Sequence, residues 1–219
     1  MNIKKKFSDS DLDRIKQSVR AAEENISGEI VPVIVERSSN YTIAIYKGCL
    51  ITAALTFMII VLIDRYVLEE ATHTLLYDPL FIFLLVILGG AIGAAITNYS
   101  DTIKRLLVAQ RYQDLVTRQA AENAFLEEEV FNTRQRTGIM IFVSFFEHEV
   151  IVMADTGINK VVEQQQWDNL VAEIIDRIRG GKLVEAIEHG ISRCGTLLLE
   201  KGFKKTADDI NELRDDLRL

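Results

Sequence analysis

Cysteine, proline and histidine are scarce in this sequence, which has 2 Cys, 2 Pro and 3 His among 219 residues. Cys49 and Cys194 lie in separate apolar stretches, so we expect no disulfide between them and a domain in a reducing compartment. With so little proline and no low-complexity segment, long disordered linkers are not expected. The sequence contains neither a C-x-x-C pair nor an H-E-x-x-H motif, which excludes two common zinc patterns.

Basic residues are a minority, with 25 Lys and Arg against 32 Asp and Glu. The net charge of −7 argues against a nucleic-acid groove, because such a groove needs a basic face to meet phosphates. Three lysines at residues 4–6 are not followed by an apolar core, so we do not expect a signal peptide. Gly180-Gly181-Lys182 is too short for a phosphate loop and more simply ends a helix.

Charge is absent altogether from two long runs, residues 48–63 and residues 79–99. The second run is long enough to cross a bilayer, which needs about 20 mostly apolar residues. The first reaches that length if Tyr46 and Tyr66 lie at the two membrane interfaces. We therefore predict a transmembrane helical hairpin, and the alternative is a pair of core helices buried in a soluble protein.

The predicted hairpin over residues 41–99 divides the chain into three parts. Residues 1–40 supply the first helix and strand of one domain, and residues 100–219 supply the remainder, with an acidic C-terminal tail. Lys and Arg near the spans are concentrated on the two flanks, which places both termini in the cytoplasm. They are Arg37, Lys47, Lys104, Arg105, Arg111 and Arg118 on the flanks and Arg65 in the loop.

Small residues recur along the second apolar run. Gly89 and Gly93 are four residues apart, and Gly90 begins a parallel pair with Ala94. This spacing lets another helix backbone approach closely. The partner helix is either the first span of the same chain or a second copy, so a homo-oligomer through the Gly89/Gly93 face is an alternative to packing within the hairpin.

Outside the hairpin, the patterns predict helices around a small sheet. Residues 29–36 are expected to form a strand in which Pro32, which cannot donate to a ladder, marks either an edge position or a bulge. Residues 139–146 are apolar throughout, which is typical of a central strand buried on both faces, and residues 149–154 form its hairpin partner. Apolar residues at helical spacing fill the segments before and after these strands. The fold class is therefore α/β, a small sheet sandwiched between helices and interrupted by the hairpin.

Four predictions concern helical segments. One continuous helix is expected over residues 101–129, because apolar residues recur along it. His189 is followed by a glycine, and we expect it near a helix end, where it would interact with the C-terminal dipole. The tail after residue 206 suggests a short, partly docked helix. Trp167 is interpreted as a core anchor, with a surface stacking platform as the alternative.

Several short motifs occur in a characteristic order along the chain. They are Ser27-Gly28-Glu29-Ile30, Arg136 through Ser144, Glu147-His148, Asp155-Thr156-Gly157-Ile158, Trp167, Gly180-Gly181-Lys182, Gly190-Ile191 and Asn211-Glu212-Leu213.

Together, these motifs resemble the TPM domain family, named after a thylakoid lumen protein, a photosystem II assembly factor and a receptor modulator. The resemblance covers residues 7–38 and about 102–215. It implies a small sheet between helices, and it implies the family's proposed roles: acid phosphatase activity, calcium binding, and assembly or repair of membrane complexes. The resemblance to a bacterial, membrane-anchored member implies a location at the bacterial inner membrane.

Asp155 is the foremost candidate for a metal site. It follows a predicted strand and precedes a turn, where an exposed carboxylate can bind calcium or magnesium. Calcium needs about six to eight oxygen ligands, so Glu29, Glu147 and Asp101 would have to lie close to it. The alternative is a carboxylate that caps the following turn.

Other candidates carry charge or a titratable ring. Arg134 and Arg136 precede the central strand and could bind a phosphate or a partner carboxylate, or else form a solvated turn. His148 with its neighbouring glutamates could form an acid–base cluster, although a hairpin tip is usually solvated. Cys194 is expected to be a small buried apolar residue. No complete set of nucleophile, base and orienting group is visible, so no catalytic residue is assigned.

Two functions follow from these observations. The first is a membrane-anchored cytoplasmic interaction module of TPM-like fold, which would help to assemble or maintain an envelope complex through an unidentified protein partner. The second is a metal-assisted phosphatase that depends on calcium or magnesium, with Asp155 in its site. A channel or transporter is disfavoured, because the two spans contain no ionisable residue to mark an ion path.

Overall fold

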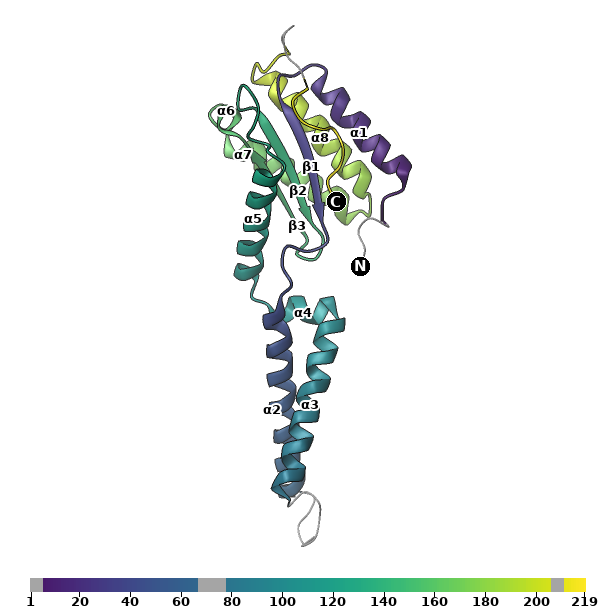
Figure 1. Cartoon of the computed structure of the whole chain (residues 1–219), viewed down its shortest axis with the longest axis vertical. Coiled ribbons are helices and arrows are strands. Elements are labelled where there is room, and N and C mark those ends of the chain that lie inside the picture. Colours follow the sequence, from purple (N-terminus) through teal and green to yellow (C-terminus); the bar gives the residue numbers. More distant parts are fainter. Residues whose placement is uncertain (1–5, 67–77, 206–210) are drawn as a thin grey trace. The chain divides into compact units, whose positions relative to one another are not determined.

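The structure is a computed structural model that describes residues 6–66, 78–205 and 211–219 (Figure 1). Within these residues the chain is a mixed α/β protein with eight helices and one three-stranded sheet. It divides into two compact units. We call Met1–Ser39 with Asp114–Leu219 the sheet unit, and Asn40–Gln113 the hairpin unit.

The sheet has the order β1-β2-β3. β1 (Glu29–Val35) and β2 (Gly138–Ser144) are parallel, and β3 (Glu149–Ala154) pairs antiparallel with β2. Every residue of β2 is buried, so the prediction of a central strand covered on both faces is confirmed. A parallel pair needs a crossover of a dozen or more residues, and the long segment between β1 and β2 supplies it.

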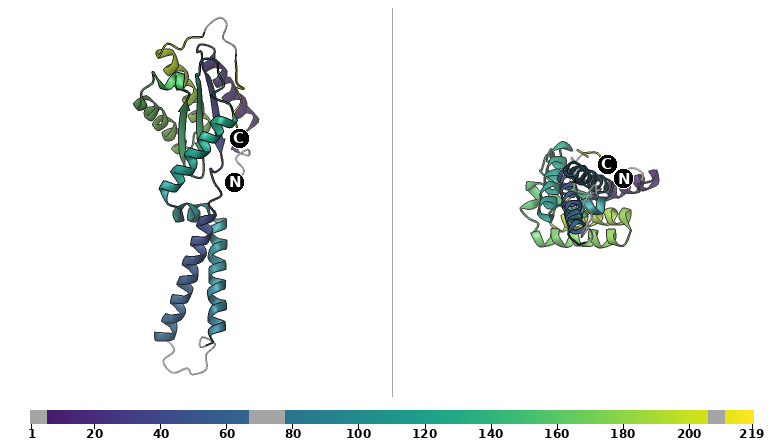
Figure 2. Two further views of the ribbon diagram at one scale, coloured as in Figure 1. Left: turned by 60° about the vertical axis from the view of Figure 1, so that its left-hand side comes forward. Right: turned by 90° about the horizontal axis from the view of Figure 1, so that it is seen from below.

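Helices cover both faces of the sheet (Figures 1 and 2). On one face, apolar residues of α1, α7 and α8 pack on those of the strands into a single core. On the other, the part of α5 that belongs to the sheet unit packs Ala121 and Phe125 over Met140 and Phe142. Ser8 caps α1 through a reciprocal pair of hydrogen bonds with Asp11. The helices are α1 (Asp9–Glu23), α5 (Gln110–Glu127), α6 (Thr156–Asn159), α7 (Gln164–Arg179) and α8 (Leu183–Glu200).

The C-terminal segment is extended where a helix was expected. Arg218 N donates to Pro32 O at 3.0 Å, and Ile34 N donates to Arg218 O at 2.9 Å, so the chain end covers the outer edge of β1. Pro32, which has no N–H, lies in an edge strand of the sheet, the first of the two alternatives expected for it. The helix prediction is wrong for residues 211–219, because this pairing satisfies strand groups that a helix would leave open. Residues 206–210, which were part of that prediction, lie outside the described residues.

The hairpin unit contains α2 (Thr42–Tyr66), α3 (Pro79–Tyr99) and α4 (Asp101–Leu107). α2 and α3 are each long and apolar enough to cross a membrane. Core helices of a soluble protein are mostly buried, whereas only 11% and 17% of the most apolar windows of α2 and α3 are buried. Leu50 and Phe83, for example, are 72% and 60% exposed.

The small residues of α3 pack against α2 of the same chain. A Cβ atom at Gly89 or Gly93 would overlap a threonine side chain of α2, and one at Gly90 would lie 3.2 Å from Cys49 Sγ. The glycines therefore allow the two helices to approach closely, and Figure 2 shows them side by side. In this structure the Gly89/Gly93 face is occupied within the hairpin.

The single helix expected over residues 101–129 is broken, and that prediction is wrong. Val108, between α4 and α5, has an extended backbone with φ −96° and ψ 129°. The Gln113 side-chain amide donates to the carbonyls of Arg105 and Val108, each at 3.0 Å. Because this side chain satisfies carbonyls left open at the end of α4, the helix can stop there.

Candidate functional site

The sheet brings Glu29, Gly138 and Asp155 into one row. Glu29 pairs with Gly138 across β1 and β2, and Asp155 N donates to Gly138 O at 2.9 Å. We call this end of the sheet the Asp155 end. Two strand spacings separate the outer members of the row, so the Cα atoms of Glu29 and Asp155 are about 10 Å apart.

Asp155 is buried, with 4% of its surface exposed. Its Oδ1 accepts a hydrogen bond from Thr156 N at 2.6 Å and so caps α6. Its Oδ2 lies 2.9 Å from Arg136 Nε as an ion pair that lacks hydrogen-bond geometry, and no hydrogen bond from the described residues reaches it. The capping alternative is confirmed, and the second carboxylate oxygen is buried and paired with a guanidinium.

The loop before β2 is shaped around Arg136. Arg136 has φ 58°, a left-handed conformation that is uncommon for a residue other than glycine. Gly157 N donates to Arg136 O at 3.0 Å, and a Cβ at Gly157 would lie only 2.6 Å from that oxygen. The half-exposed guanidinium lies 5.7 Å from the ring centre of Phe131. Arg136 is therefore held in place by contacts with Asp155, Gly157 and Phe131.

Arg134 and Glu29 are both engaged by the C-terminal segment. Glu212 Oε2 accepts from Arg134 N at 2.9 Å, and its other oxygen lies 3.4 Å from Arg134 Nε. Glu212 N in turn donates to Glu29 Oε1 at 3.0 Å. Burial raises the pKa of Glu29 above its usual range, and the Glu212 carboxylate adds to the effect. Arg134 thus pairs with a carboxylate of its own chain, and its binding of a phosphate or of a partner's carboxylate stays a prediction.

Glu29 and Asp155 do not share a ligand site, although they lie in the same row. Gly138 lies between them, and a Cβ there would overlap the backbone oxygen of Val130. The loop that contains Val130 therefore passes directly over the middle of the row. A cation would have to displace that backbone to contact both carboxylates.

Glu147 lies at the opposite end of the sheet. It accepts hydrogen bonds from Ser38 N at 2.9 Å and from the Ser144 hydroxyl. A strand rises about 3.3 Å per residue, so β3 separates Glu147 from Asp155 by about 20 Å. Asp101 belongs to the hairpin unit. Among residues 6–66, 78–205 and 211–219, no group of three His, Cys, Asp or Glu side chains could hold a metal ion.

A buried carboxyl that the sequence reading missed lies near the Asp155 end. Glu23, on α1, is 7% exposed, and its Oε1 accepts from Ile30 N at 2.8 Å. Burial raises the pKa of Glu23 to about 8, and the Glu29 and Asp215 carboxylates add to the effect. The available signal was spacing: Glu23 follows Ile15 and Val19 at intervals of four, on one helix face.

Asp215 also went unrecognised in the sequence. It is buried and accepts from Arg20 Nε at 2.6 Å, and Asn211 also donates to it. Glu23 lies beside a cavity of about 220 Å³ whose rim includes Arg20 and Lys205. Glu23 and Asp215 both accept hydrogen bonds from donors of this chain, and these bonds offset the cost of burying the two carboxyl groups.

His189 is a contact between two helices, and the helix-end prediction is wrong. α8 continues past it to Glu200. His189 Nε2 lies 2.6 Å from Glu173 Oε2 on α7, and this hydrogen bond lowers the pKa of Glu173. Gly190 lies inside the helix and does not end it. A glycine is needed there because a Cβ atom would lie 2.8 Å from Ile174 Cδ1 of the neighbouring helix.

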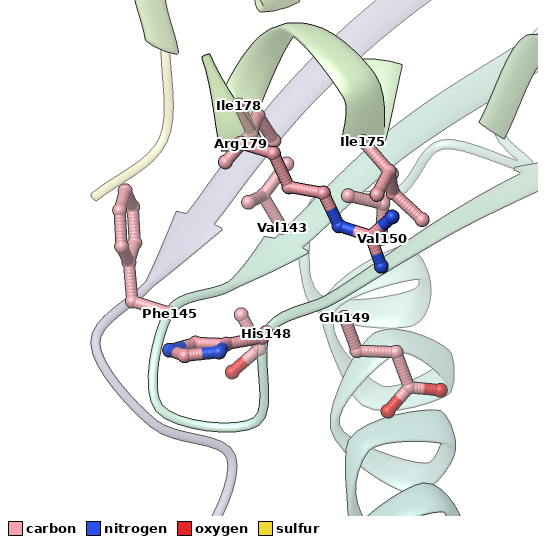
Figure 3. A pocket seen from close by; sticks show the side chains of 9 residues that line it. Val143, Phe145, His148, Glu149, Val150, Ile175, Ile178 and Arg179 are labelled. Carbon is pink, nitrogen blue, oxygen red and sulfur yellow. The ribbon is translucent and has the colours of Figure 1, made fainter. Parts of the chain in front are cut away.

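The remaining candidates fall into the core or the β2–β3 turn. Trp167 and Cys194 are buried, as expected, and burial raises the pKa of the Cys194 thiol to about 12, so it is not a nucleophile. His148 has φ 58° and closes the turn that precedes β3. Its ring and the Glu149 carboxylate point in different directions (Figure 3).

Comparison with known proteins shows a likeness of fold. The NMR structure of the BA42 protein from the psychrophilic bacterium Bizionia argentinensis sp. nov. matches with a TM-score of 0.56 at 18% identity, over 97% of this chain and 94% of that chain. At this identity the likeness concerns the fold alone. No family model matches the chain, and no curated protein matches it.

Proposed function

We propose that the chain is a membrane-anchored interaction module of TPM-like fold. Its sheet unit lies in the bacterial cytoplasm, α2 and α3 anchor it in the inner membrane, and it helps to assemble or maintain an envelope complex. The observation that carries this proposal is the exposed apolar surface of α2 and α3. Contiguous apolar surface of this extent is unfavourable in water and is typical of contact with lipid or protein.

The TPM resemblance has a physical counterpart in two glycines of the quoted motifs. A Cβ at Gly138 would overlap Val130, and one at Gly157 would meet the Arg136 and Gln135 carbonyls. Both positions thus require glycine because the loop before β2 folds closely over them. The glycines of these motifs are thus explained by the close packing of the loop at the Asp155 end. This explanation supports a shared fold and does not depend on any activity.

The interaction role is tested by crosslinking in native membranes, followed by co-purification with a tag on the full chain. We expect a membrane protein to be recovered with this chain and to be absent when an unrelated two-span hairpin with the same tag is purified. Recovery of the same proteins with both baits would contradict the proposed role.

The proposed orientation predicts a labelling pattern. A cysteine at Thr72, which lies between the two spans in the sequence and outside the described residues, should react with a membrane-impermeant maleimide in intact cells. A cysteine at the exposed Glu24 of the sheet unit should not react until the cells are opened. Both variants also carry Cys49→Ala and Cys194→Ala. The reverse pattern would place the sheet unit outside the cytoplasm.

A second candidate function, a phosphatase assisted by calcium or magnesium, is favoured by one observation. Asp155 Oδ2 is buried, has no hydrogen-bond donor within the described residues, and faces the Arg136 guanidinium. A carboxylate is a ligand that a hard cation prefers, and a guanidinium is a donor that a phosphate prefers, so either ligand would have to separate this pair. The two candidates are separated by replacing this carboxylate.

We expect Asp155→Asn to lower the free energy of unfolding by at most about 1 kcal/mol, because asparagine can still cap α6 and the lost ion pair involves a half-exposed arginine. Co-purification of the partner should persist, and neither calcium nor magnesium should raise the melting temperature. Asp13→Asn, at an exposed site, is the matched control. A rise in wild-type melting temperature with either cation, lost only in Asp155→Asn, would favour the phosphatase instead.

A further inference from the structure

The outer edge of β3 offers backbone groups that the described residues leave unpaired. Asp155 N points to β2, and groups alternate along a strand, so the N–H and C=O of Val150, Val152 and Ala154 point away from the sheet. The Asn159 side chain donates to Ala154 O at 2.6 Å, in agreement with this direction. Within the part of the chain that the structure describes, no hydrogen bond reaches the outward groups of Val150 and Val152.

The two edges of the sheet differ in how they are covered. At β1, the extended C-terminal segment pairs with Pro32 and Ile34 through Arg218. At β3, no described segment occupies the equivalent position. A free strand edge is a template for another extended chain, and proteins usually cover or block such edges.

One cavity follows the free edge of β3, and a second begins at Val150 and extends over the α7 face of the sheet to Val143 of β2. We call them together the β3 groove. One, of about 510 Å³, lies along residues 151–154, between Arg118 of α5 and Trp167 of α7. The other, of about 330 Å³, lies at Val150 and is lined by Ile175 and Arg179 of α7 (Figure 3). Residues of α5 and α7 therefore line the groove on its two sides, with the backbone of β3 between them.

The groove is suited to an extended peptide more than to a second copy of this chain. A second copy would approach with its own α5 and α7 flanking β3, so helices of the two copies would meet before the strand edges did. A single extended segment needs no such clearance. Its side chains alternate between two faces, one row toward the α7 face of the sheet, where Val150 and Ile175 line the cavity.

The charge of Arg179, at one end of the groove, indicates which charged group a partner segment should carry there. Arg179 is exposed, it lines the same cavity as Val150, and no ion pair to it is found among the described residues (Figure 3). The Glu149 carboxylate points away from Arg179 and lies near Thr117 of α5. The local charge that a ligand meets at this end is therefore positive, and a carboxylate complements it.

We propose that the β3 groove binds an extended segment of a partner protein as a fourth strand of the sheet, with alternating apolar side chains and a carboxylate at the Arg179 end. This inference rests on the proposed role as an interaction module and assigns the surface and partner chemistry of that role.

The test uses the full chain in detergent micelles and two fluorescent peptides with blocked ends. In both, valine alternates with threonine, and an aspartate stands at the first position in one and at the last position in the other. We expect one of them to bind saturably and to slow hydrogen exchange at the Val150 and Val152 amides. The Ile151 amide, which faces β2, should be unchanged. Failure of both peptides to bind would overturn the proposal, as would protection of these amides by chain concentration alone, which indicates a second copy.

Two variants locate the bound strand. Val152→Pro removes an outward N–H and no hydrogen bond to β2, so the fold should persist and peptide affinity should fall about tenfold or more. Arg179→Gln should weaken the aspartate peptide about threefold and leave a matched asparagine peptide unaffected. If both variants bind like wild type, the groove is not the site.

The same variants separate this inference from the proposed function. In native membranes, Val152→Pro should lose the crosslinked partner that the wild-type chain recovers. If the partner is retained in Val152→Pro, the interaction role stands and the β3 groove is wrong. Should Val152→Pro fail to fold, Arg179→Gln with the paired peptides still decides between the two outcomes.

Discussion

Replacing Trp167 with alanine is expected to lower the free energy of unfolding by about 3–5 kcal/mol, the usual cost of deleting a large buried ring. Trp167 is 6% exposed, and it belongs to the core formed by the strands with α1, α7 and α8. Domains are stable by only about 5–15 kcal/mol, so this loss would leave the sheet unit close to unfolding. Urea titration followed by circular dichroism measures it, because the variant has no tryptophan to report fluorescence.

The matched control is Val161→Ala, six residues earlier, where the side chain is 45% exposed. We expect that variant to stay within about 0.5 kcal/mol of the wild type. If Trp167→Ala unfolded at the same urea concentration as the control and lost only peptide binding, the ring would be a surface platform beside the β3 groove.

Local pattern was sufficient for the elements whose environment is uniform along their length. Charge is missing from residues 48–63 of α2 and from the whole of α3 because apolar side chains cover these segments all round. β2 is apolar throughout because both of its faces are buried. Pro32 also allowed a local prediction, an edge position or a bulge, because the missing N–H is a property of that residue alone.

The remainder depends on contacts between residues distant in sequence. The C-terminal segment becomes extended because β1 offers an edge, and Arg218 by itself carries no signal of that pairing. Likewise, the end of α4 depends on the Gln113 side chain folding back. Apolar periodicity predicts a helix that continues past Leu107, because the periodicity carries no information about which backbone carbonyls a polar side chain binds.

The grouping of Glu147 with Asp155 could have been rejected from the sequence itself. Both were placed in one candidate site, yet residues 149–154, the predicted strand, lie between them. An extended segment of that length holds its two ends about 20 Å apart, so one metal ion cannot bind both. The positions of Glu29 and Asp155 in a single row, with Val130 over Gly138 between them, required the structure.

Raising the pH is expected to destabilise the sheet unit through Glu23. Burial raises the pKa of this carboxyl from 4.5 to about 8 in the folded chain. Between these two values the folded state binds more protons than the unfolded state, so stability is fully present below about pH 4.5 and falls as the pH rises toward 8. At 1.36 kcal/mol for each pKa unit, the loss is on the order of 5 kcal/mol.

Glu23→Gln isolates this contribution, because glutamine keeps an oxygen that can accept from Ile30 N and cannot ionise. We expect the variant to match the wild type near pH 4.5 and to exceed it in stability by several kcal/mol above pH 8, as measured by urea titration at each pH. Burial also raises the pKa of Glu29 and Glu149, so the variant should retain a shallower fall of the same sign. Glu24→Gln, the exposed neighbour, should follow the wild-type curve. Parallel curves for Glu23→Gln and wild type would mean that Glu23 is ionised in the folded chain at neutral pH, and its contact with Ile30 would then be a charge-assisted cap of the strand.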